Sequence, residues 1–346
     1  MSGRTQHYLP QFLQRPFSHR ENNGYFYVHV YEKSTQYSPN TAGVGAKRDF
    51  YSSPEDPKAD ENITAAEIFI ASTINKIIGS EELPIGQDTA RIFSSLSLRT
   101  LKMRKAMSEL APDMISALRT KAIEEGWALE AMQKQFDDQQ WINRTIEEQI
   151  KKDAGKMDRN KRATLKVRLK VTLKREYEEN KEKWLKDLRL LTDTAMSSLE
   201  SQAAKIADDA FAKVFADPAG LVKRDLLFSE FHYTLIKDEP GNFLLGDCAV
   251  TALDTNFKPR LAMGDVDDEV TLSQVFLPIS PHLVIRGTRQ CYAPLHTVRE
   301  INENSVALSN SFFISLHSSS DEIERLRPLI GSVSSPIVSL EELLVF

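Results

Sequence analysis

The feature that most constrains the fold of this chain is a change of hydrophobic period along its 346 residues. Between about residues 62 and 214, apolar side chains recur every three or four positions, a spacing that predicts helices. The segment Tyr25–Tyr31 and several segments after Asp217 instead contain short aromatic and aliphatic runs bounded by turn-forming residues, which predicts strands. Two strand-forming ends therefore enclose a helical section of roughly 150 residues.

This order of elements predicts an α+β fold with a small mixed or antiparallel sheet from N- and C-terminal strands and a large helical middle section. We expect residues 1–60 to hold an N-terminal motif and a strand, and residues 61–216 to be helical. Residues 217–346 would supply strands and final helices and pack with 1–60 as one domain. The segment 164–174 stays open, because its apolar residues alternate as in a strand while its leucines recur every four residues as in a helix.

The composition restricts the class of protein. An apolar content of 41% is enough to bury a sizeable core, and the formal charge of -5 means that nucleic-acid binding would need a local basic patch. Two cysteines, Cys248 and Cys291, are too few for a disulfide framework or a cysteine-rich zinc site. The chain lacks the apolar runs of a signal peptide or a membrane span. We expect a cytoplasmic protein with no membrane partner.

One local concentration of charge lies at 151–175, where eleven Lys or Arg residues accompany two Asp residues. On a helix, Arg162, Lys166 and Lys170 would form one stripe and are the candidate phosphate contacts. Acidic residues at 127–150 and 176–190 offer the alternative that these charges are paired within the chain. Nucleic acid is therefore one candidate partner. The other is a partner protein or a second copy of the chain, bound through the helices.

The opening of the chain, His7 to Ser18 (HYLPQFLQRPFS), resembles the opening HYxPxFxLRxFS of the prokaryotic domain of unknown function DUF4238. Three later segments resemble the family in the same order: the aromatic strand ending YEK at 31–33, DFY at 49–51, and LPISP at 277–281. The chain departs at Gln14, where the family has Leu, and at 245–249, where only Asp247 remains of a TSDNP-like element. The family's asparagine near the final helix corresponds to Asn302, with Asn304 as the competing alignment.

Three polar residues on these motifs are the candidate catalytic residues: His7, Asp247 and Asn302. An imidazole titrates near neutrality and suits acid–base work, and a carboxylate at a strand end can bind a metal or orient a histidine. The alternatives are that His7 binds a backbone carbonyl, that Asp247 forms a turn, and that Asn302 caps the final helix. Arg15 and Ser280, the latter in a stiff turn between prolines, are the candidate substrate-binding residues.

If His7, Arg15, Asp247 and Asn302 converge, they supply a base, a cation, a carboxylate and an amide donor, which suffice to hydrolyse a phosphodiester. The leading hypothesis is a cytoplasmic hydrolase-like effector acting on nucleic acid or a nucleotide, either a nuclease or another phosphodiester or nucleotide hydrolase, of the kind found in prokaryotic toxin or phage-defence loci. The alternative is a non-catalytic interaction module built on the long helices. No motif fixes a cofactor. A divalent metal ion is an option, no residue is assigned as its ligand, and the acidic run at 264–270 has the character of a solvated loop.

Overall fold

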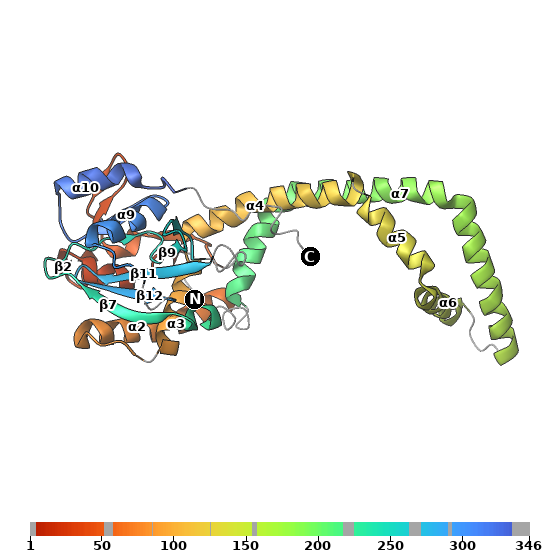
Figure 1. The fold of residues 1–346 in the computed structure, drawn as a ribbon, viewed down its shortest axis with the longest axis horizontal. Coiled ribbons are helices and arrows are strands. Elements are labelled where there is room, and N and C mark those ends of the chain that lie inside the picture. The colour runs from red at the N-terminus through yellow and green to blue at the C-terminus, as the bar shows by residue number, and fades with distance from the viewer. Residues whose placement is uncertain are drawn as a thin grey trace. The chain divides into compact units, whose positions relative to one another are not determined.

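The computed structural model describes residues 5–51, 58–84, 86–124, 126–153, 158–216, 225–262, 271–289 and 293–333. The chain is 58% helical and 18% strand. Every strand pairing among these described residues is antiparallel (Figure 1). The predicted α+β class is therefore confirmed. The acidic run at 264–270 and Cys291 lie outside the described residues.

The chain divides into two compact units. Unit 1 comprises Met1–Glu109 and Ile206–Phe346, and unit 2 comprises Leu110–Lys205. The helical segment that the sequence predicts at 61–216 contributes to both units. Its first helices, α2 (Lys58–Ser80) and α3 (Gly86–Leu98), pack against the sheets of unit 1.

The larger sheet of unit 1 has the strand order β10-β9-β11-β12-β7. All nine residues of its central strand β11 are buried, because α2 packs on that strand while α9 packs on the neighbouring β9 and β10. A strand covered on both faces has a nearly continuous apolar sequence instead of an alternating one. The strands are β7 (His232–Lys237), β9 (Thr251–Asp254), β10 (Pro259–Arg260), β11 (Leu272–Ser280) and β12 (Leu283–Thr288).

A second sheet joins the two ends of the chain. In its order β5-β4-β13-β8, β4 (His29–Tyr31) pairs with β13 (Phe313–Ser315), with Val30 opposite Ile314. The other two strands are β5 (Gln36–Tyr37) and β8 (Leu245–Gly246). N-terminal and C-terminal strands therefore do build one sheet, as the sequence predicts. Two-stranded pairs complete the N-terminal part: β1 (Thr5–His7) with β6 (Ala46–Arg48), and β2 (Arg20–Asn22) with β3 (Tyr25–Tyr27).

Short helices surround these sheets. They are α1 (Gln11–Gln14), the 3-10 turns Arg15–Phe17, Thr41–Gly43 and Arg327–Leu329, α9 (Val298–Leu308) and α10 (Asp321–Leu326). Helix α9 begins at Thr297, whose side chain and that of Glu300 form a capping box.

Two local expectations differ from the structure. The final helices expected near the end of the chain are interrupted by a strand, because α9 ends at Leu308 and the chain continues as β13. The residues 278–281 are not an isolated turn either, because Pro278 to Ser280 form the end of β11, where a bulge interrupts the pairing with β12.

The structure of unit 2 shows whether the segment 164–174 is a strand or a helix. Residues 164–174 lie in the helix α7 (Arg159–Ala216), so the helical interpretation is right. Leu165, Leu169 and Leu173 of α7 pack against three isoleucines of α6 (Gln139–Asp153): Ile142, Ile146 and Ile150. The other helices that contribute to this unit are α4 (Leu101–Arg119), the π turn Thr120–Glu124 and α5 (Trp127–Asp137).

Candidate functional site

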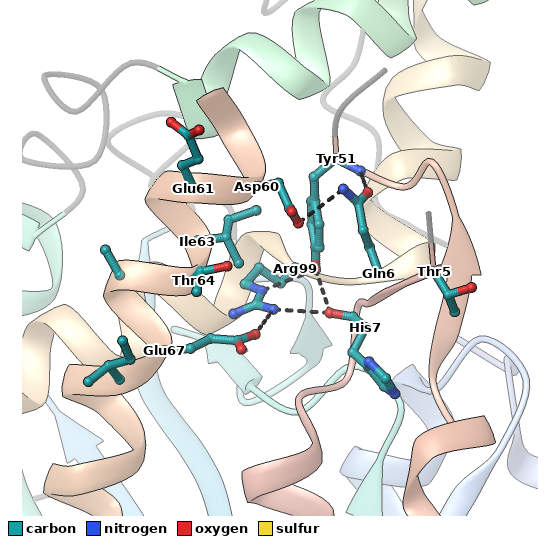
Figure 2. A pocket seen from close by; sticks show the side chains of 12 residues that line it. Thr5, Gln6, His7, Tyr51, Asp60, Glu61, Ile63, Thr64, Glu67 and Arg99 are labelled. Atoms are coloured by element: carbon teal, nitrogen blue, oxygen red, sulfur yellow. Dashed lines mark hydrogen bonds and ion pairs between the residues drawn. The ribbon is translucent and has the colours of Figure 1, made fainter. Parts of the chain in front are cut away.

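The candidate site is a pocket of about 620 Å³ in unit 1. It lies between β1, the turn that carries Tyr51, helix α2 and the short connection between α3 and α4 (Figure 2). Most of the lining side chains are polar or charged: Thr5, Gln6, His7, Tyr51, Asp60, Glu61, Thr64, Glu67 and Arg99.

Arg99 is the central side chain of this pocket, and only 2% of the residue is exposed. Its Nε donates to the hydroxyl of Tyr51 at 3.1 Å, and its Nη2 donates to the backbone carbonyl of His7 at 3.0 Å and to the carboxylate of Glu67 (Figure 2). The guanidinium also lies over the Tyr51 ring, 5.3 Å from its centroid. The third nitrogen, Nη1, is buried and has no hydrogen-bond partner among the residues that the structure describes. Two of the five N–H donors of this buried cation, both on Nη1, thus remain unused.

The position of Arg99 follows from a break between two helices. Helix α3 ends at Leu98, and the amide of Arg99 donates to the carbonyl of Leu96. The hydroxyl of Thr100 then accepts from the amide of Met103 and so caps α4. Arg99 is therefore held at a helix-to-helix junction, where the backbone is fixed on both sides.

The electrostatics keep Arg99 charged and Tyr51 neutral. Burial opposes the guanidinium charge, but Tyr51 and Glu67 outweigh it and raise the pKa of Arg99. Burial raises the pKa of Tyr51 to about 12, so its hydroxyl keeps the proton that it donates to the His7 carbonyl at 3.1 Å. The neutral hydroxyl is thus both an acceptor for Arg99 and a donor to the backbone.

A second hydrogen-bonded connection fixes the upper edge of the pocket in Figure 2. Gln6 donates to Asp60 at 3.1 Å and accepts from the amide of Tyr51 at 2.6 Å. Among the described residues, the lining carries three carboxylates, on Asp60, Glu61 and Glu67, and one guanidinium, that of Arg99. In the part of the chain that the structure describes, no group of three or more His, Cys, Asp or Glu residues could hold a metal ion.

His7 belongs to this pocket, but mainly through its backbone. The carbonyl accepts from Arg99 and Tyr51, whereas the ring Nε2 lies 3.1 Å from the carbonyl of Ala42. Figure 2 shows the imidazole turned away from the guanidinium. Burial lowers the pKa of His7, so the ring is neutral at physiological pH. The ring of His7 therefore lies beside a backbone carbonyl, which is the role that the sequence analysis gives as the alternative to a catalytic one.

Asp247 is 1% exposed and accepts three backbone hydrogen bonds, from the amides of Asn310 at 2.7 Å, Ser311 at 2.8 Å and Phe312 at 3.4 Å. Burial raises the pKa of Asp247 to about 6, although these three bonds oppose the shift. The carboxylate therefore fixes the segment that connects α9 to β13. The N-terminal motif approaches it through Tyr8, whose pKa is raised by burial and by the charge of Asp247.

Asn302 is a buried cross-link between α9 and the segment before β8. Its Nδ2 donates to the carbonyl of Asn242 at 2.8 Å, and its Oδ1 accepts from the amide of Leu244 at 3.0 Å. The alternative role of helix cap is wrong, because Thr297 occupies the N-cap position. Asn302 also lines a separate pocket of about 210 Å³ with His317.

The two candidate substrate-binding residues near the chain ends lie elsewhere. Arg15 is exposed in the 3-10 turn, with its guanidinium 5.5 Å from the centroid of the Phe26 ring. Ser280 is buried at the end of β11, accepts from the amide of His282 at 3.2 Å and lines a third pocket of about 350 Å³. His7, Arg15, Asp247 and Asn302, all of them described, therefore make no hydrogen bond to one another.

The basic stretch is partly neutralised inside unit 2. Glu147 of α6 accepts from Arg162 at 2.9 Å and from Lys166 at 2.7 Å. Hydrogen bonds from Lys166 and Arg162 lower the pKa of Glu147, which keeps the carboxylate charged. Lys170 is half-buried in α7. Two of the three candidate phosphate contacts are thus already paired with a carboxylate. This matches the alternative stated in the sequence analysis, that the basic charges are paired within the chain.

The sequence indicates only part of the observed pocket. His7 and Tyr51 lie on two of the segments that carry the family resemblance, and Gln6 is the neighbour of one of them. Arg99 and Glu67 lie on no segment that carries the family resemblance, and nothing in their spacing distinguishes a buried ion from a solvated one. Comparison of the burial of the described basic residues singles out Arg99, which is 2% exposed, less than Lys102 or Arg286.

The fold, with N- and C-terminal strands in one sheet and a helical unit between them, is that of a member of an α+β family. The chain belongs to the family described as "Protein of unknown function (DUF4238)", which matches residues 5–323. The match includes every residue of the pocket. No curated protein and no solved structure matches the chain. Among the described residues, no helix combines the length and the apolar character needed to cross a membrane.

Proposed function

We propose that the chain is a hydrolase-like enzyme whose site is the Arg99 pocket, with Glu67 as the general base and Arg99 as the group that holds the oxyanion. The observation that carries the proposal is the fully buried guanidinium with an unpartnered Nη1 beside a partly exposed carboxylate. The lining offers one group for each role of this chemistry: Glu67 as the base, Arg99 as the cation, Asp60 as a second carboxylate and Gln6 as an amide.

Arg99 has the properties required to stabilise developing negative charge. Three of its donor interactions fix the guanidinium in place, so it needs no reorganisation when a substrate arrives. Its burial means that a hydrogen bond to a remaining donor is strengthened by the low local dielectric. A rearrangement of the nearby side chains that admits a substrate oxygen to Nη1 would satisfy an orphaned donor of this cluster.

Glu67 has the properties required of a base. Its Oε1 accepts from Arg99, which leaves Oε2 available, and its side chain is 32% exposed. It can therefore reach water or a substrate while the ion pair fixes its orientation. Positioned carboxylates commonly perform this proton transfer in hydrolases.

The charge of the lining favours a small substrate. Three carboxylates against one guanidinium repel a polyanionic strand, and the paired state of Arg162 and Lys166 removes part of the predicted nucleic-acid surface. We therefore propose a small cytoplasmic substrate, such as an ester or amide, in which one oxygen accepts a hydrogen bond from Arg99. A nuclease acting in phage defence is the competing outcome of the same assay.

The test is a panel of chromogenic esters, amides and phosphodiesters, offered to the full chain with and without Mg²⁺ or Mn²⁺. Wild type should turn over an ester or amide, and Glu67→Gln should lose at least about 100-fold in rate, the size of a general-base contribution. Glu82→Gln is the matched control, because Glu82 is exposed and lies outside the pocket. If wild type hydrolyses the phosphodiester but neither the ester nor the amide, the protein is a nuclease and this proposal is wrong. No turnover, or equal rates for wild type and Glu67→Gln, would reject it.

The second candidate function is the interaction module, which a specific observation favours. Leu191 and Leu199 of α7 are 67% and 41% exposed and lie on one face of the helix, and exposed apolar side chains that share a face mark interaction surfaces. This function does not exclude the first, because the pocket belongs to unit 1 and these two residues belong to unit 2.

A further inference from the structure

Within unit 2, helix α7 carries a stripe of residues on one face that we call the α7 seam: Leu188, Leu191, Ala195, Leu199 and Gln202. Their spacing of three or four residues keeps them on one side of the helix over about 21 Å, at 1.5 Å per residue. Leu191, Ala195, Leu199 and Gln202 are exposed, and Leu188 is half-buried. The seam is thus an apolar stripe with a small residue at its centre.

The other described parts of unit 2 contact α7 either on its opposite face or further upstream along the helix. Arg119 forms ion pairs with Asp193 and Glu200, both of which point away from the seam by helical geometry. The leucines that contact α6 lie further upstream, at 165–173. The seam therefore stays open while the intramolecular contacts of α7 are made elsewhere on its surface.

We infer that the α7 seam binds the same seam of a second copy of the chain, in an antiparallel, two-fold symmetric pair of helices. This inference rests on the interaction function of α7 and is independent of the pocket. The inner part of the seam is palindromic about Ala195, because Leu191 and Leu199 lie four residues to either side; seven residues out, the antiparallel pair places Leu188 opposite Gln202. In an antiparallel pair centred there, Ala195 meets Ala195, and each Leu191 meets the Leu199 of the other copy.

The charges beside the seam complement one another under the same symmetry. Asp187 and Lys205 lie on the same flank of the seam and are exposed. In an antiparallel pair, the same flanks of the two helices meet, so each Asp187 faces the Lys205 of the other copy with an offset of only two residues, or about 3 Å. A parallel pair would instead bring opposite flanks together, so Asp187 and Lys205 would not meet across it. The small Ala195 at the centre allows the two backbones to approach closely.

The test is sedimentation velocity of the full chain over a concentration series. Wild type should form a reversible dimer, and Leu191→Glu should weaken dimerisation at least about ten-fold by placing a charge in the apolar centre. Val171→Glu is the matched control, because Val171 is also exposed on α7, at 63%, but lies outside the seam. It should leave the dimerisation constant unchanged.

The charge pair gives the decisive variants. Asp187→Lys and Lys205→Asp should each weaken dimerisation by about three- to ten-fold, whereas the double variant should restore it, since each pair is re-formed with reversed signs. Wild type that stays monomeric, a dimer unaffected by Leu191→Glu, or a double variant that is weaker than both single variants would overturn the inference. Measuring the turnover of Leu191→Glu at the same time separates this inference from the proposed enzyme function. A variant that loses the dimer but keeps its turnover would show that the seam acts in dimerisation and not in catalysis.

Discussion

Arg99 and Glu67 form an ion pair with unequal burial, since the arginine side chain is 1% exposed and the glutamate side chain 32%. The arginine is held by the protein on three sides, and the glutamate connects it to solvent. This asymmetry defines the pocket as a place where a fixed cation and an accessible carboxylate meet. It also predicts that the two residues contribute differently to stability and to turnover.

Arg99→Lys should lower the free energy of unfolding by about 3 kcal/mol, because a single ammonium cannot serve Tyr51, His7 and Glu67 together and leaves buried acceptors without donors. Urea unfolding followed by circular dichroism measures this change. Arg48→Lys is the matched control, since Arg48 is exposed on β6, and it should change stability by no more than about 0.5 kcal/mol. Equal effects of the two substitutions would show that Arg99 is not a structural centre.

Asn302→Ala should destabilise the chain by about 2–4 kcal/mol, because the amide of Leu244 and the carbonyl of Asn242 both lose a buried partner. Asn304→Ala, two positions along the same helix, should change stability by less than about 1 kcal/mol. Thermal and urea unfolding of both variants measure the difference. A larger loss for Asn304→Ala would favour the competing alignment.

Asp247 should make the folded state less stable as the pH rises. Its pKa is about 6 in the fold, above the ordinary value of 3.8, so the native state holds its proton more tightly than the unfolded state. The stabilisation is fully present below pH 3.8 and is lost as the pH rises through 6. Relative to Asp247→Asn, wild type should lose about 3 kcal/mol across this window. Urea unfolding of both proteins from pH 4 to pH 7 tests this, and a constant difference would contradict it.

Glu147→Gln should increase binding to nucleic acid, because it removes the carboxylate that pairs with Arg162 and Lys166. Fluorescence anisotropy with a labelled oligonucleotide should show weak binding by wild type. The variant should bind more tightly and with a steeper dependence on salt, by about one additional phosphate contact. Glu148→Gln, at the adjacent exposed position, is the control. Strong binding by wild type, unchanged in Glu147→Gln, would instead support the basic stretch as a nucleic-acid surface.

The sequence predicts the fold class well because hydrophobic period is a local property. The pairing of Val30 with Ile314 follows from two short apolar runs that cannot bury their faces alone. The residues at which individual helices and strands begin and end are less predictable. Residues 313–315, which follow Leu308, form strand β13 because they pair with β4 and β8. These strands are distant in the sequence, so the local spacing of apolar residues does not reveal the pairing.

The site is less predictable than the fold. His7 is recognisable because an imidazole in a compact aromatic block is unusual, yet the sequence does not indicate that the carbonyl, and not the ring, faces Arg99. Asp247 has the position of a strand-end carboxylate, but its three amide donors come from a loop more than 60 residues away. Arg99 and Glu67 are brought together by the packing of α2 against the α3–α4 connection, which no spacing rule describes.

The measurement that tests the central claim most directly compares the turnover of Glu67→Gln with that of His7→Ala on the substrate that wild type hydrolyses. If the base is Glu67, its substitution lowers kcat at least about 100-fold, while His7→Ala, which keeps the backbone carbonyl that Arg99 binds, loses less than about ten-fold. The reverse order would contradict the account and identify the imidazole of His7 as the base.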